Sequence, residues 1–257
     1  SPQVVLAWSS CYQVFKTHLP EVGIVSLWDL YAQHGLPTQS PITTRQLPVT
    51  IHDPCTTRYE SHIQDSARTI VRQLGYEIAE LPLSREKTEC CSYGGNMWLA
   101  NRDLAKKVVE RRVAESPLDY VTYCAMCRDF FAAQDKRTLH LLDLIYNQTT
   151  SEQAARRGPG WSQRHENRAR LKRKLLKDLW GEDMADHAAY EAIQLIISDE
   201  VQARLEQRLI LIEDVQRVLE YAQRTGRKLF NRETGRYLAY FKPTAVTYWV
   251  EYVPQGE

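Results

Sequence analysis

Short apolar runs alternate with helical patterns over the first 147 residues of the chain. The runs occupy residues 4–7, 47–51, 76–81 and 120–123. Each run has the length of a β-strand, and strands that alternate with helices are typical of a parallel sheet with crossover connections. We therefore predict an α/β domain with a parallel sheet over residues 1–147.

Helical periodicity is clearest between the second and third runs. The apolar positions there are three or four residues apart and comprise Ile63, Ala67, Ile70, Val71 and Leu74. This spacing places them on one face of a helix, which Gly75 is expected to end. A second helical face, marked by Leu104, Val108 and Val109, is predicted before the fourth run.

The same part of the chain contains an imperfect internal repeat. Residues 4–15 and 26–31 resemble residues 120–131 and 140–146, which aligns Cys11 with Cys127 and Trp8 with Cys124. The first copy therefore lacks one sulfur. Because the second copy follows a long cysteine-bearing segment, we expect the first copy to have had an upstream counterpart and the domain to be truncated at its N-terminus.

A change of composition divides the chain after residue 147. Residues 148–163 are poor in apolar residues and contain the sequence Arg-Arg-Gly-Pro-Gly, so we predict a linker. Residues 164–257 are predicted to form a small α+β module. Its expected elements are helices at 164–180, 186–197, 199–211 and 213–225, the last ended by Gly226, and then a β-meander over 228–252.

Charge and hydropathy exclude several classes of protein. The 33 basic and 32 acidic residues leave a net charge of +1, which gives no reason to expect binding to nucleic acid. A basic run does occur in the helix predicted at 164–180, and we interpret it as a solvated face or a contact for a protein partner. No apolar run approaches the roughly 18 residues of a transmembrane helix, and no secretion signal is recognisable, so we expect a cytoplasmic protein.

The six cysteines carry the chemistry of the sequence. They form an adjacent pair at 90 and 91, a Cys-Xaa-Xaa-Cys motif at 124–127, and single residues at 11 and 55. In a chain without a secretion signal, such clustering favours metal binding or redox chemistry over disulfides or simple structural thiols. Walker loops and dinucleotide-binding glycine motifs are absent from the sequence, so we do not expect it to bind a nucleotide or flavin.

The cysteines follow predicted strands. Asp53 is expected to cap a helix that begins at Pro54, which puts Cys55 in its first turn, and the strand at 120–123 leads directly to Cys124. The carboxyl ends of parallel strands share one edge of a sheet, so these thiols can meet there. Adjacent cysteines suit a multi-iron cluster better than a single tetrahedral zinc ion.

Three motifs resemble the CCG cysteine-rich domain of iron-sulfur oxidoreductases of the heterodisulfide reductase type. They are His-Asp-Pro-Cys at 52–55, Cys-Cys-Ser-Tyr-Gly-Gly at 90–95 and Tyr-Cys-Ala-Met-Cys at 123–127. The resemblance implies a Rossmann-like fold and a [4Fe-4S] cluster, of cubane or non-cubane type, bound by Cys55, Cys90, Cys91, Cys124 and Cys127. It also implies an oxidoreductase that exchanges electrons with a disulfide or thiol substrate and with flavin or ferredoxin-like subunits.

The resemblance also suggests individual roles. A substrate disulfide would approach near Cys90 and Cys91, and His52 would orient a ligand or move a proton, although His-Asp-Pro is equally a favourable strand-to-helix turn. Tyr93 and Met126 are expected to shield the cluster from water. Ser92 stands where the family pattern has glycine, and Trp8 makes a second cluster around Cys11 doubtful.

One alternative to the cluster stays open from the residues alone. Zinc bound by Cys55, Cys124, Cys127 and one member of the pair would make the domain a structural or partner-docking module without redox activity.

Overall fold

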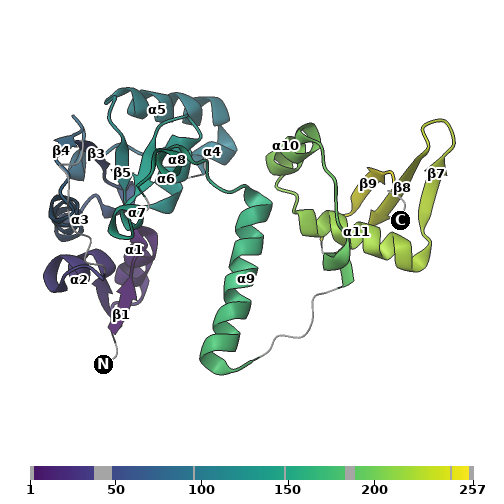
Figure 1. Ribbon diagram of the computed structural model, residues 1–257, viewed down its shortest axis with the longest axis horizontal. Helices are drawn as coiled ribbons and strands as arrows, with labels where there is room; N and C mark the ends of the chain where they lie inside the picture. Colours follow the sequence, from purple (N-terminus) through teal and green to yellow (C-terminus); the bar gives the residue numbers. More distant parts are fainter. Residues whose placement is uncertain are drawn as a thin grey trace. The chain divides into compact units, whose positions relative to one another are not determined.

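A computed structural model describes residues 3–37, 48–94, 96–147, 149–182, 189–243 and 245–254 of the chain. The chain divides into two compact units, Ser1–Gly158 and Pro159–Glu257, which are considered separately (Figure 1). Among the described residues, no helix combines the length and the apolar character required to cross a lipid bilayer.

The first unit is built on a four-stranded parallel sheet. Its strands, in spatial order, are β4 (Ile78–Glu80), β3 (Val49–His52), β5 (Tyr120–Thr122) and β6 (Thr138–His140). All three strand pairs are parallel, so the carboxyl ends of the strands lie along one edge. This confirms the predicted α/β class.

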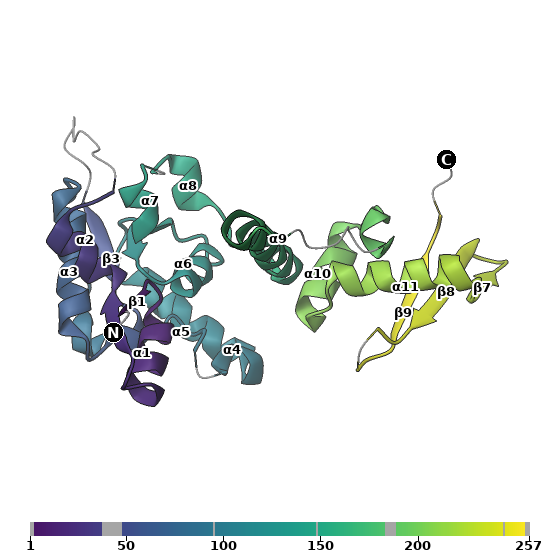
Figure 2. The same ribbon diagram turned by 90° about the horizontal axis from the view of Figure 1, so that it is seen from below.

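Helices connect the strands and cover both faces of the sheet. They are α3 (Ser61–Gln73), α4 (Met97–Ala100), α5 (Arg102–Ala114), α6 (Ala125–Ala132) and α7 (Leu141–Ile145). Figure 2 shows α3 and α5 to either side of β3. The predicted apolar face of α3 is buried throughout, and its residues pack with Val49 and Ile51 of β3, whereas Val109 of α5 packs in a second cluster with Tyr120.

The buried face of α5 differs from the predicted one. Leu104 is 49% exposed, and the buried positions are Ala105, Val109 and Arg112. These residues are four and then three positions apart, so they share one face of the helix. The sequence pattern included Val109 but missed Arg112, because a charged residue does not mark an apolar face and its partner His52 lies 60 residues away along the chain.

The beginning of the chain forms a small sheet of its own. Strand β1 (Gln3–Leu6) pairs in parallel with β2 (Gly23–Ser26) in a two-stranded sheet, so residues 4–7 do not join the main sheet as expected. The order β1, α1 (Ser9–His18), β2, α2 (Leu27–His34) matches the order β5, α6, β6, α7. The internal repeat is therefore a repeat of structure as well as of sequence.

The segment expected to be a linker contains regular structure. Within 148–163, the described residues include helix α8 (Ser151–Ala155), which is capped by the Thr150 side chain and buries Ala154 in the first unit's core. Helix α9 (Trp161–Trp180) then begins three residues before the predicted basic helix. Gln148 lies outside the described residues.

The second unit combines helices with an antiparallel meander. Helices α10 (Asp199–Arg208) and α11 (Ile212–Thr225) precede strands β7 (Lys228–Asn231), β8 (Arg236–Phe241) and β9 (Tyr248–Tyr252), which pair in sequence order. Val218 and Ala222 of α11 pack on Ala239 of β8. The predicted meander is confirmed, and Gly226, with φ of +72°, ends α11 as expected.

One predicted helix of this unit does not form over its expected length. Residues 186–188 lie outside the described residues, and 189–192 form only a short 3-10 helix, η3 (Ala189–Ala192). Residues 193–198 are irregular. The adjacent β-branched residues Ile196 and Ile197 lower helix propensity there, and the Gln216 side chain instead binds the backbone carbonyl of Ile193.

Candidate functional site

The cysteine groups lie at the ends of neighbouring strands. Cys55 begins the 3-10 helix η1 (Cys55–Thr57), three residues after β3, and Cys124 lies two residues after β5 as the N-cap of α6. Cys127 lies in the first turn of α6. Cys90 and Cys91 belong to the loop between the 3-10 helix η2 (Arg85–Lys87) and α4.

The five thiols are in contact in one continuous series. The order of contact is Cys55, Cys90, Cys91, Cys127 and Cys124. The structure thus brings together all five residues that the sequence singled out as ligands. Cys11 is exposed on α1 and takes no part in this series.

Hydrogen bonds from two sides lower the pKa of Cys90. The thiols of Cys55 and Cys91 act first, followed by the backbone N–H groups of Ser92 and Gly94. The Ser92 N–H donates to the Cys90 sulfur over 3.3 Å. Cys90 is therefore the thiol at this end of the series that most readily carries negative charge.

Cys124 occupies the corresponding position at the other end. Its pKa is lowered mainly by the Cys127 thiol and also by the backbone N–H groups of Cys127 and Met126. The pKa of Cys55 and of Cys127 is raised, chiefly because each thiol donates to a neighbouring sulfur. In the metal-free protein, neighbouring thiols of the series therefore share protons in hydrogen bonds. A bound metal would replace those protons.

The series is buried at one end and partly open at the other. Cys91, Cys124 and Cys127 are buried, whereas Cys55 and Cys90 are partly exposed. A molecule from solvent would therefore reach Cys55 and Cys90 first.

The residues expected to shield the cluster differ in burial. The ring of Tyr93 is largely exposed and lies 5.1 Å from the ring of Phe130. Met126 is partly buried and packs against the apolar cluster that contains Cys91, Cys124 and Cys127. The shielding role of both residues stays a prediction.

His52 lies on the same face of the sheet as the buried cysteines. Side chains alternate along a strand, so Ile51 faces α3 while His52 faces α5 and α6. Its ring is fully buried and meets the ring of Phe131 edge-on at 4.6 Å. Burial, with a further contribution from the charge of Arg112, lowers the pKa of His52 to about 3, so its imidazole is neutral at pH 7.

Arg112 determines the tautomer of His52. The guanidinium Nε of Arg112 lies 3.3 Å from Nδ1 of His52. Because a guanidinium can only donate, Nδ1 must accept, and the ring hydrogen is on Nε2. Glu115 binds the same guanidinium at 2.6 Å. Arg112 was not predicted as a site residue, since a single arginine within a polar helical segment gives no distinguishing signal.

Several buried polar atoms near the cysteines lack hydrogen-bond partners among the described residues. In the first unit these atoms are His52 Nε2, Glu89 Oε2, Ser92 Oγ, Arg112 Nη2 and Thr122 Oγ1. They come from β3, β5, α5 and the loop that bears the cysteine pair. Buried polar groups in proteins are nearly always bonded, so these atoms have the capacity to bond a further group.

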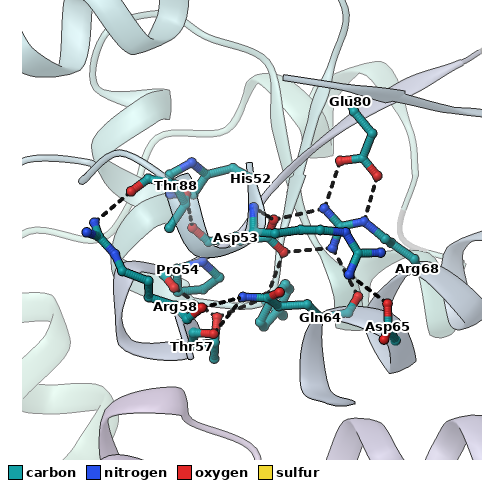
Figure 3. Close-up of polar contacts among 12 residues, drawn as sticks. His52, Asp53, Pro54, Thr57, Arg58, Gln64, Asp65, Arg68, Glu80 and Thr88 are labelled. Atoms are coloured by element: carbon teal, nitrogen blue, oxygen red, sulfur yellow. Dashed lines mark hydrogen bonds and ion pairs between the residues drawn. The ribbon is translucent and has the colours of Figure 1, made fainter. Parts of the chain in front are cut away.

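Asp53 has a different role from the predicted helix cap. Its carboxylate is fully buried and receives two hydrogen bonds from Arg68, at 2.9 and 2.8 Å (Figure 3). It receives a third from the Tyr123 hydroxyl at 2.8 Å. Burial alone would raise the pKa of Asp53, but the bonds and charge of Arg68 lower it. Arg68 also binds Glu80, so one guanidinium links β3, α3 and β4.

The same network fixes two cysteine-bearing segments to each other. The backbone N–H of Arg85 donates to Asp53 at 2.8 Å. The Thr88 hydroxyl donates to the Asp53 carbonyl at 2.7 Å (Figure 3). Arg58 donates to the Thr88 carbonyl at 2.7 Å. These bonds join the turn that holds Cys55 to the residues just before Cys90, which positions both thiols.

The described residues form no recognisable metal-binding group. No group of three or more histidine, cysteine, aspartate or glutamate side chains among them is arranged to hold one metal ion.

Comparison with known proteins identifies one segment of the chain. Residues 49–131 match the family model of the CCG cysteine-rich domain, and this segment contains all five contacting cysteines. The resemblance to that domain is therefore confirmed for this segment. No curated protein and no solved structure was found to match the chain.

Proposed function

We propose, from the CCG cysteine-rich domain at residues 49–131, that this protein binds an iron-sulfur cluster and transfers electrons to or from a disulfide or thiol substrate. The ligands would be Cys55, Cys90, Cys91, Cys124 and Cys127, and the cluster a [4Fe-4S] centre of cubane or non-cubane type. The observation that carries the proposal is the continuous contact of these five thiols at one edge of the parallel sheet.

The surroundings of the thiols fit a bound group. Backbone N–H groups already face the sulfurs of Cys90 and Cys124, as expected around thiolates. His52 supplies a neutral N–H donor, and the Asp53–Arg68 network holds the strand end from which Cys55 follows. A bound cluster would supply one-electron exchange, and hydrogen bonds to its sulfurs would tune its reduction potential.

The open end of the thiol series is the proposed place of reaction. Cys90 is the partly exposed member of the adjacent pair, so a disulfide from solvent would meet the site there. Reduction of one disulfide to two thiols consumes two electrons and two protons. A flavin or ferredoxin-like partner would deliver the electrons. The protons would come from solvent at this open end, because His52 is neutral and buried.

The second unit is proposed to serve contacts rather than chemistry. None of the side chains of α9 is buried within the unit, and its sequence is strongly basic. Such a helix suits docking to an acidic redox partner. The abundance of free thiols is in keeping with a reducing compartment, so we propose that the protein works in the cytoplasm.

Metal analysis tests the proposed function. Protein purified without exposure to air should be brown and contain iron and acid-labile sulfide in similar amounts. The variants Cys90→Ser and Cys91→Ser should each lose or convert the cluster while the second unit keeps its fold. A colourless wild-type protein with one zinc per chain and no sulfide would refute the redox function and favour the zinc-binding alternative.

A further inference from the structure

Ser92 adopts a backbone conformation that favours glycine. It directly follows the adjacent cysteines, and its φ is +73°. In this left-handed region, the Cβ atom of an L-residue approaches the following carbonyl oxygen, which costs about 1–2 kcal/mol relative to glycine. A glycine at this position would avoid that strain.

The hydroxyl of Ser92 adds a second cost. The residue is fully buried, and Oγ has no hydrogen-bond partner among the described residues. An unsatisfied buried hydroxyl costs about 1–3 kcal/mol. Both costs arise from the side chain alone and would be absent with glycine. Ser92 is thus unfavourable in the ligand-free fold, and it lies beside the candidate site. A bound group that accepts a hydrogen bond from the Ser92 hydroxyl would remove the second of these two costs.

The position of Ser92 determines what that group would be. The backbone N–H of Ser92 donates to the Cys90 sulfur at 3.3 Å, and the side-chain oxygen lies only three bonds from that nitrogen. A Cβ atom placed on Gly94 would lie 3.9 Å from the same sulfur. The loop therefore wraps closely around Cys90, and Ser92 belongs to the backbone that surrounds its sulfur.

We propose that the Ser92 hydroxyl donates a hydrogen bond to a sulfur at the site of the cysteine pair, either the thiolate of a metal-bound cysteine or a sulfide of a bound cluster. This inference rests on the proposed function for its redox consequence only. A donor to sulfur withdraws electron density and favours the reduced state, so Ser92 raises the reduction potential of the cluster and strengthens its retention. Ser92 is a positioning and tuning residue and takes no part in bond making or breaking.

Two substitutions separate the hydroxyl from the backbone strain. Ser92→Ala removes the hydroxyl and keeps the Cβ atom, whereas Ser92→Gly removes both. In the metal-free protein, the melting temperature should rise from wild type to Ser92→Ala and further to Ser92→Gly. Metal affinity should change in the opposite direction, with both variants about tenfold weaker than wild type or more. A purely structural role would change affinity and stability in the same direction.

Leu209→Gly in the second unit is the matched control. Leu209 has φ of +56° and an exposed side chain, so the substitution relieves comparable strain away from the cysteines. It should leave metal affinity unchanged.

Chelator competition and redox titration provide the measurements. With iron and sulfide bound, both Ser92 variants should also lose up to about 59 mV of reduction potential, which corresponds to a tenfold change in a one-electron equilibrium. Equal metal affinity and equal reduction potential in wild type and Ser92→Ala would refute the role of Ser92. The proposed cluster would not be refuted by this result. If wild type binds only zinc, the cluster is refuted, and the zinc affinities of the same variants still decide the role of Ser92. Failure to bind either metal would overturn both.

Discussion

The two copies of the internal repeat have the same local structure, but the strand that begins the second copy is buried and the strand that begins the first is partly exposed. In each copy a parallel pair of strands encloses a helix and leads into a second helix, and the aligned residues Ser26 and His140 both cap that second helix. Asp29 and Asp143 occupy the same position, three residues after the cap. The local sequence therefore builds the same supersecondary unit twice.

The copies differ in what packs against them. Strand β5 is wholly buried between β3 and β6, and Cys127 of its copy contacts Cys91 of the loop that bears the cysteine pair. Strand β1 is partly exposed, Trp8 is 44% exposed, and Cys11 is exposed. A helix start that bears cysteine becomes a candidate site only where a neighbouring strand and loop supply the remaining thiols.

The largest expected effect comes from removing equivalent sulfurs in the two copies. Cys127→Ser takes one thiol out of the contact series and should reduce bound iron and sulfide at least tenfold. Cys11→Ser removes the aligned thiol of the first copy and should leave the metal content unchanged. Iron and sulfide per chain, measured after anaerobic reconstitution, with circular dichroism to verify folding, check this comparison. Equal losses in both variants would contradict it.

A smaller effect is expected from the histidine that packs behind the second copy. His52 has a pKa of about 3 in the folded protein, against about 6.5 when unfolded. Between these values the unfolded chain binds a proton that the folded chain does not. Stability is therefore fully retained above pH 6.5 and falls as the pH decreases towards 3, by about 1.4 kcal/mol per pH unit for this group.

The variant His52→Gln should lose this part of the pH dependence. Urea unfolding of the metal-free protein at pH 7, 6 and 5 measures the slope. The variant should show a shallower fall in the free energy of unfolding than wild type. An unchanged slope would show that His52 takes up its proton without loss of the fold.

The smallest effect is expected from restoring the missing sulfur of the first copy. Trp8→Cys completes a Cys-Xaa-Xaa-Cys motif at residues 8–11, yet iron content should not increase. Trp8 and Cys11 are exposed at the start of α1, whereas Cys124 and Cys127 are buried beside the other thiols. A second equivalent of iron in this variant, measured beside wild type, would show that the local motif is sufficient.

Local patterns in the sequence were enough to predict most elements and the grouping of the five cysteines. The strands, the buried face of α3 and the final meander follow from apolar spacing and turn residues within short windows of the chain. The convergence of the five cysteines was also predictable, because carboxyl ends of parallel strands share an edge. The patterns that predict strands and helices are local properties of the sequence. The convergence of the cysteines requires one further, long-range rule, that parallel strands have their carboxyl ends at the same edge of a sheet.

Tertiary structure alone decided the polar environment of the site. Arg112 contacts His52 across 60 residues of sequence, and Arg68 contacts Asp53 across 15. The positive φ of Ser92 and the burial of Ala154 in the first unit's core likewise depend on packing. A buried charge is tolerated only where a partner reaches it, and no local pattern specifies a partner that another element supplies. The sequence therefore determined which sulfurs could meet, and the fold decided which of the two copies gives them an enclosed, hydrogen-bonded site.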